Sequence, residues 1–170
     1  MSSVKRLLVV LACVLSLNAV AEDKIAVIDV ARAIFSTDIA KQRQDEMQSG
    51  IEFSSLQAKY DNIGADMKAL QKEVEGKAMT LSQEQAGDYK KKMEYLRADM
   101  ELVSRKLQAE VKELQNKIMQ ELQPKALEAI KELVEEGKIT LLLQREAVIS
   151  ATPDKDLTGK LVDRMNKKTR

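Results

Sequence analysis

The chain has 170 residues, the size of a single domain, and its formal net charge of +1 gives no electrostatic case for binding nucleic acid. It contains no histidine, so the commonest general base and the commonest zinc ligand are both missing, and we expect no catalytic centre, no metal site and no cofactor. Charged residues make up 32% of the chain and aromatic residues only 3%, which suits long helices with solvated faces better than a compact globule.

The first 21 residues are typical of a secretory signal peptide. The basic pair Lys5-Arg6 is followed by an apolar run from Leu7 to Leu17, and Ala19-Val20-Ala21 supplies the small residues of a cleavage site. The apolar run is too short to span a membrane, so we expect export and cleavage after Ala21. A signal anchor, or a lipoprotein cleaved before Cys13, are the alternatives.

Two long helices are predicted to follow a short β-rich segment. Lys24 to Asp29 reads as a strand, and Val30 to Phe35 as a helical turn packed on it. With Asp38 as its cap, one helix is predicted to run to about Gly76, with bends at Gly50 and Gly64 because glycine costs about 1 kcal/mol relative to alanine. After the capping box Ser82–Gln85, a return helix is predicted from about Gln83 to Glu136, ending at Gly137.

Apolar residues in both long helices recur at alternating spacings of four and three, which is the seam of a coiled coil. Residues 38–136 are therefore predicted to fold back at the polar stretch Glu75–Gly87 into an antiparallel hairpin arm, a shape for gripping or bridging. The expected seam pairs are Leu70 with Tyr89, Met67 with Met93, Ile63 with Leu96, Tyr60 with Met100, Leu56 with Val103 and Phe53 with Leu107.

The remaining segments predict a small β body. Pro124 is expected to kink the return helix where arm and body meet, and the wide apolar face of Ala126–Val134 to dock onto a core. Ile139–Leu143 and Ala147–Ile149 are predicted to form a two-stranded hairpin, and an amphipathic helix, with Leu161 on its apolar face, to end near Lys167.

Three short strands would make a poor core alone, so we expect a body of residues 22–37 and 137–170 that is shared among subunits. The fold class predicted is therefore α+β, mainly α. The residues expected to build the shared body are Ile25, Val27, Ile28, Leu141, Leu142, Leu143, Val148 and Ile149.

The order of these features resembles the Skp/OmpH family of periplasmic chaperones. The resemblance rests on Lys24-Ile-Ala-Val-Ile-Asp29, on Pro124 near the base of the return helix, on the two short apolar runs and on Asp156-Leu157-Thr158 before the last helix. It implies a homotrimer whose β-barrel body carries three helical arms around a cavity. The family holds unfolded outer-membrane proteins in that cavity in the periplasm, without ATP. Members are strongly basic, whereas this mature chain is near neutral, which weakens the case for lipopolysaccharide binding.

The predicted arm tip carries the candidates for client contact. Met79 and Leu81 have no seam partner, and would either touch the client or close the turn in a small cluster. Lys77 and the run Lys90-Lys91-Lys92 would either attract anionic client segments, anionic lipid or lipopolysaccharide, or form a solvated helix face. An exported coiled-coil adaptor or structural protein of the cell envelope is the alternative function, and no enzyme motif is found.

Overall fold

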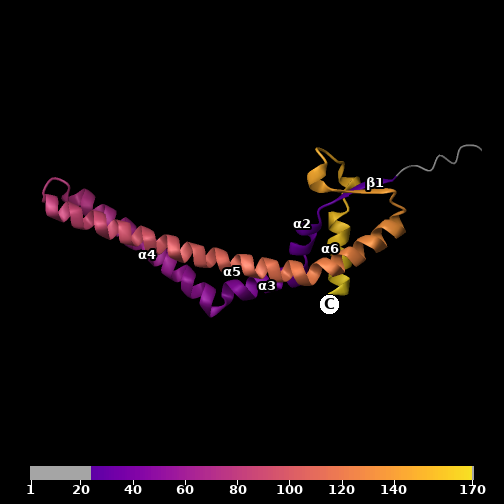
Figure 1. Cartoon of the computed structure of the whole chain (residues 1–170), viewed down its shortest axis with the longest axis horizontal. Helices are drawn as coiled ribbons and strands as arrows, with labels where there is room; N and C mark the ends of the chain where they lie inside the picture. The colour runs from indigo at the N-terminus through magenta and orange to yellow at the C-terminus, as the bar shows by residue number, and fades with distance from the viewer. Residues whose placement is uncertain (1–23, 170) are drawn as a thin grey trace, which may run out of the picture.

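The computed structural model describes residues 24–169 and shows a long helical arm standing out from a small body (Figure 1). The predicted mainly helical α+β fold with a hairpin arm is confirmed for one chain, while the predicted signal peptide lies outside the described residues. The elements are β1 (Ile25–Ile28), α2 (Val30–Phe35), α3 (Asp38–Ser49), α4 (Ile51–Lys77), α5 (Gln83–Gly137), β2 (Leu141–Gln144), the 3-10 turns η1 (Arg145–Ala147) and η2 (Pro153–Lys155), and α6 (Thr158–Lys168).

The sheet consists of β1 and β2 in parallel, with Ile25 opposite Leu141, and the whole arm forms the connection between the two strands. The predicted hairpin of Ile139–Leu143 with Ala147–Ile149 is wrong within this chain. A tight hairpin turn needs residues such as Asn-Gly, and the segment after β2 forms the turn η1 instead. The far side of β1 is occupied by a bridge between Val27 and Asp156, so Ala147–Ile149 finds no strand partner here.

The core of the body lies where α2, α6 and the base of α5 pack against the sheet. Ile34, Ile118, Leu161 and Met165 have no exposed surface, and Ala26 and Ile28 of β1 belong to the same cluster. The predicted docking of the apolar face of α5 is thus confirmed, and it begins earlier than expected, at Ile118. The predicted apolar face of the terminal helix is also confirmed, because Leu161 and Met165 fill the centre of this core.

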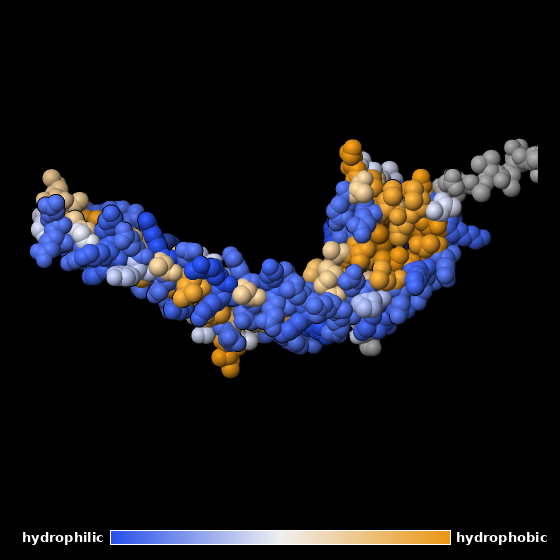
Figure 2. All heavy atoms as spheres, viewed as in Figure 1, coloured by the Kyte–Doolittle hydropathy of each residue, from blue (hydrophilic) through white to orange (hydrophobic). Residues whose placement is uncertain are grey.

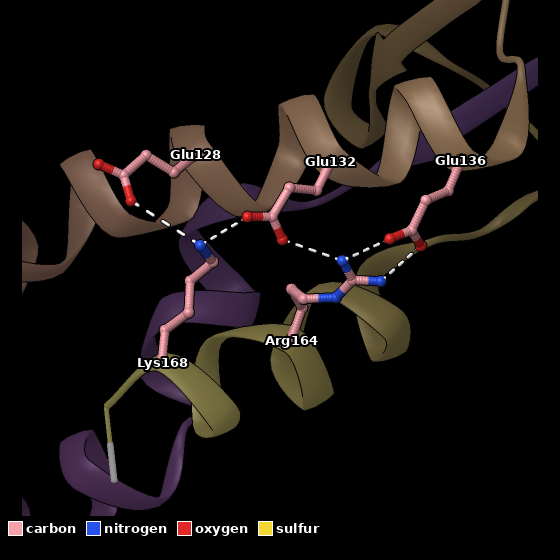
Figure 3. A network of polar contacts seen from close by, with 5 residues as sticks. All are labelled: Glu128, Glu132, Glu136, Arg164 and Lys168. Carbon is pink, nitrogen blue, oxygen red and sulfur yellow. Dashed lines mark hydrogen bonds and ion pairs between the residues drawn. The ribbon is translucent and has the colours of Figure 1, made fainter.

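Ion pairs join side chains of α6 to side chains at the base of α5 (Figure 3). Arg164 donates from Nη1 to Glu132 at 2.9 Å and from Nη2 to Glu136 at 2.6 Å. Lys168 lies 2.6 Å from Glu132 and 3.9 Å from Glu128. Both cations hold the pKa of Glu132 below its usual range, and Arg164 does the same for the pKa of Glu136. These contacts lie at the rim of the core and fix the orientation of α6.

The arm is a coiled coil of α4 and the outer part of α5, as predicted. Every predicted seam residue is half-buried or buried, and its neighbours along each helix are mostly exposed. The predicted partner of Met100 is Tyr60, yet its terminal methyl lies 3.5 Å from the position of a Cβ on Gly64. The hydroxyl of Tyr89, whose predicted partner is Leu70, donates to Glu73 at 2.6 Å. Both long side chains reach toward the arm tip, because side chains of a helix lean toward its N-terminus, and the predicted pairing stays a prediction.

A break at Gly50 divides the first predicted long helix into α3 and α4. Gly50 has an extended backbone (φ −63°, ψ 146°), and Figure 1 shows the sharp bend there. Gly64, by contrast, stays within α4. The cap before α3 is the Thr37 side chain, whose hydroxyl accepts from the Ala40 amide, and Asp38 is the first helical residue rather than the predicted cap.

The return helix α5 is continuous for 55 residues, about 80 Å. It starts with the predicted capping box of Ser82 and Gln85 and runs through Pro124. It bends where it reaches α2 and α6 (Figure 1), as expected of an internal proline. Gly137 is its last helical residue, and Lys138 takes the left-handed conformation that ends it (φ 49°).

Candidate functional site

The tip of the arm presents one free apolar side chain and one apolar groove. Met79 lies in the turn between α4 and α5 and is 101% exposed, so it makes no closing cluster. Leu81 is half-buried and lines a groove of about 420 Å³ between the two helices. The apolar walls of this groove are Val74, Leu81, Ala86, Tyr89 and Met93. The two predicted tip residues therefore differ: one is free to touch another molecule, and the other helps to shape a groove.

The four predicted tip lysines do not act alike. Lys77 lies 2.7 Å from Glu73, and Tyr89 donates to the same carboxylate. Hydrogen bonds from Lys77 and Tyr89 lower the pKa of Glu73, so the carboxylate stays ionised and offsets the charge of Lys77. Lys92 lies 5.8 Å from the centre of the Tyr89 ring, within the range of a cation–π contact. Lys90 and Lys91 are exposed.

A second groove of about 450 Å³ lies between α4 and α5 and involves a residue that the sequence analysis missed. Its lining includes Leu70, Leu96, Lys92 and Tyr95, and Tyr95 is 75% exposed. Tyr95 lies just outside the seam spacing, which is why the periodicity did not select it. Its one signal in the sequence is its chemistry, because the chain has only three tyrosines and no tryptophan.

The residues predicted to build a shared body divide into three sets by their exposure. Val27 and Ile28 are buried within this chain. Ile25 and Leu141 are both 47% exposed, and Ile149 is fully exposed. The remaining three, Leu142, Leu143 and Val148, are half-buried. Figure 2 shows hydrophobic residues gathered on the face of the body, whereas the arm surface in the same view is largely hydrophilic. Apolar patches of this kind on a single chain mark interaction surfaces.

The ion pairs between α5 and α6 were also missed, although the sequence holds a signal for them. Glu128, Glu132 and Glu136 recur every four residues, as do Arg164 and Lys168, so each set lies on one helix face. Between residues 24 and 169 we find no group of three or more acidic or cysteine side chains that could hold a metal ion. Within the same range, no helix has the length and hydropathy of a membrane span.

Comparison with known proteins places these features in a family. The chain is 29% identical over 153 residues to a Skp-like protein of Pseudomonas aeruginosa, and the match covers 88% of both chains. A crystal structure of a candidate OmpH-like outer membrane chaperone from Caulobacter crescentus matches 86% of this chain and 85% of its own, with 21% identity and a TM-score of 0.48. The profile of the family described as outer membrane protein (OmpH-like) matches residues 24–165, and the chain therefore belongs to this family.

Proposed function

We propose that the chain is an ATP-independent holdase chaperone of the periplasm, which binds unfolded outer-membrane proteins between helical arms and prevents their aggregation. Membership of the OmpH-like family and the relative described as Skp-like support this assignment. The observation that carries it is the arm itself, which is long, polar outside and only half-closed along its apolar seam.

The chemistry of the arm suits weak and repeated contact with an unfolded chain. Leu81 and Tyr95 line its two apolar grooves, and the exposed Met79 adds a flexible apolar side chain at the tip. Each contact is weak, but several arms around one client add their contributions. Release then needs no nucleotide, because folding in the membrane is more favourable for the client than staying bound.

We propose further that the cavity is formed by a homotrimer with a shared β body. The outward-facing side chains of Ile25, Leu141 and Ile149 support this, since a second copy would remove their apolar surface from water. In this proposal residues 1–21 are a signal peptide removed after Ala21. Residues 22–37 and 137–170 build the body, and residues 38–136 form the arm, whose base contributes to the body core from Ile118 onward.

The exposed lysines Lys90 and Lys91 support a weak contact of the tip with anionic lipid or lipopolysaccharide. We expect the chain to bind anionic vesicles at low salt and to leave them at high salt, because exposed charges are screened. Replacing Lys90, Lys91 and Lys92 with glutamine should abolish this binding. The matched control replaces Lys106, Lys112 and Lys131, which changes the charge equally but away from the tip.

Native mass spectrometry of the chain purified from the periplasm tests the main proposal. A urea-unfolded outer-membrane barrel protein is diluted into it, and a folded soluble protein serves as the control client. We expect a trimer of chains beginning at Glu22, which takes up one unfolded client and ignores the folded one. A trimer that ignores unfolded clients would move the function to an envelope adaptor. A monomer would refute the shared body and the cavity.

A further inference from the structure

One aromatic side chain of the arm is exposed although the seam gives it no packing role. Of the three tyrosines, Tyr60 and Tyr89 lie in the seam and are half-buried, whereas Tyr95 is 75% exposed. Tyr95 lies on α5 directly before the seam residue Leu96, and both side chains line the groove of about 450 Å³ between α4 and α5. An exposed aromatic ring beside apolar surface offers a face on which another ring can stack.

This groove combines three kinds of chemistry. Leu70 and Leu96 are half-buried and supply apolar surface, and Tyr95 supplies the ring. Asp66 and Lys92 are exposed and bring one carboxylate and one ammonium group to the same groove. A carboxylate accepts a hydrogen bond from an indole N–H or a phenol O–H, and an ammonium group is attracted to the face of a ring. Together these groups match an aromatic side chain better than an aliphatic one.

The other groove of the arm, which Leu81 lines, lacks this combination, and the two grooves share no lining residue. Its aromatic side chain, Tyr89, is half-buried, and its hydroxyl donates to Glu73 at 2.6 Å. Glu73 also lines the groove around Tyr95, but its carboxylate already binds Tyr89 and lies 2.7 Å from Lys77. We therefore assign the accepting role to the carboxylate of Asp66.

The class of client proposed above supplies aromatic side chains in number. Outer-membrane β-barrels carry girdles of aromatic residues at both membrane interfaces, so an unfolded barrel chain exposes many such rings. Successive side chains of an extended chain point to opposite sides, so one ring can enter a groove while its neighbours stay in water. The groove around Tyr95 lies on the outer surface of a two-helix arm and is open to such a chain.

We propose that the groove around Tyr95 is a subsite for one aromatic side chain of the unfolded client. The client ring stacks on Tyr95 and packs against Leu70 and Leu96. Asp66 accepts a hydrogen bond from the N–H of a tryptophan or the O–H of a tyrosine. This inference rests on the holdase function proposed above and adds to it a preference for one class of side chain.

The test uses the absence of tryptophan from the chain, because the emission of a tryptophan in a probe can then be followed on its own. The probe is a short peptide rich in serine and threonine with one central tryptophan, and its twin carries leucine there. We expect the emission to shift to shorter wavelength on binding, and the tryptophan peptide to bind about fivefold more tightly than the twin in competition. Tyr95→Ala should remove this preference, and Tyr95→Phe should keep it because the ring remains.

Two further variants sharpen the assignment. Asp66→Ala should weaken binding of the tryptophan peptide about twofold, and leave a naphthylalanine peptide, which has no N–H, unchanged. Leu102→Ala is the matched control, since Leu102 is 45% exposed on the same helix but does not line the groove. Circular dichroism should show every variant folded, because Tyr95, Asp66 and Leu102 lie at the surface.

The outcomes separate this subsite from the function on which it rests. Equal affinity of wild type for the two peptides would assign the groove to any apolar side chain, and a preference that survives Tyr95→Ala would place the ring elsewhere. Either result would overturn the subsite. A wild-type chain that prefers the tryptophan peptide but fails to keep a urea-unfolded outer-membrane barrel protein soluble would refute the holdase function and not the subsite.

Discussion

The body and the arm bury their apolar residues to very different degrees. In the body, Ile34, Leu161 and Met165 are completely enclosed by three helices and a sheet. Along the arm, only Ile63 and Val103 of the seam reach the same class of burial, and the other seam residues keep part of their surface in water. Two helices alone cannot surround a side chain, so the arm holds its shape with less burial per residue. The open seam thus leaves part of its apolar surface in contact with water.

Truncating one leucine in each region should show the difference most strongly. Leu161→Ala is expected to lower the free energy of unfolding by about 3 kcal/mol, because it leaves a cavity in a closed core. Leu96→Ala in the seam should cost only about 1 kcal/mol, since its side chain is half-exposed and water can fill the space. Urea unfolding followed by circular dichroism measures both. Equal costs would contradict the contrast between body and arm.

Two glycines of the arm should respond in opposite directions. A Cβ on Gly64 would lie 3.5 Å from Met100, an ordinary contact, so Gly64→Ala should stabilise α4 by roughly 0.5–1 kcal/mol. A Cβ on Gly50 would lie 3.1 Å from the Met47 carbonyl oxygen, so Gly50→Ala should bring no such gain. Thermal unfolding and solution scattering would report stability and arm shape. A straightened arm in Gly50→Ala would show that the bend depends on the missing side chain.

Acid should loosen the contact between the body and the base of the arm. The pKa values of Glu132 and Glu136 are lowered from 4.5 by their cationic partners, so their contribution to stability is full above pH 4.5. It is lost as the pH falls through the lowered pKa values. The thermal midpoint should therefore drop on acidification, and less steeply in Arg164→Gln, which lacks one of the partners. An identical pH profile for Arg164→Gln and wild type would contradict this role.

The smallest expected effect on stability is at the tip. Met79→Ser should leave the thermal midpoint unchanged, because the side chain makes no contacts in the folded chain. It should nevertheless reduce the amount of unfolded client kept soluble in a light-scattering assay, since an exposed apolar contact is lost. Ala78→Ser in the same turn is the control. If both variants protect the client as well as wild type, Met79 is not a client contact.

The helices of this protein could be predicted from sequence because each depends on a local signal. The seam spacing marks the arm, and Ser82 with Gln85 marks the start of α5. The contacts of the long seam side chains could not be predicted, because the spacing does not say how far a side chain reaches along the opposite helix, and Met100 reaches the position of Gly64. Coiled-coil spacing indicates which faces of the two helices contact each other, but it does not give the individual side-chain contacts.

The strand predicted after β2 could not be judged from local signals alone. Val148 and Ile149 have β-forming side chains, but a strand exists only when another strand pairs with it. Within one chain they stay unpaired, and the strand prediction fails. At the tip, the lack of a seam partner left client contact and a closing cluster open for both Met79 and Leu81, and the structure shows Met79 exposed and Leu81 lining a groove.

Amide hydrogen exchange tests most directly the proposal that the arm, rather than the body, binds the client. It is measured on the purified chain alone and with a urea-unfolded outer-membrane barrel protein bound. In the free protein we expect amides of α4 and the outer part of α5 to exchange faster than those of α6 and the base of α5. With client bound, exchange should slow along the arm, most of all around the grooves near Leu81 and Tyr95. Protection confined to the body, with the arm unchanged, would contradict client binding by the arms.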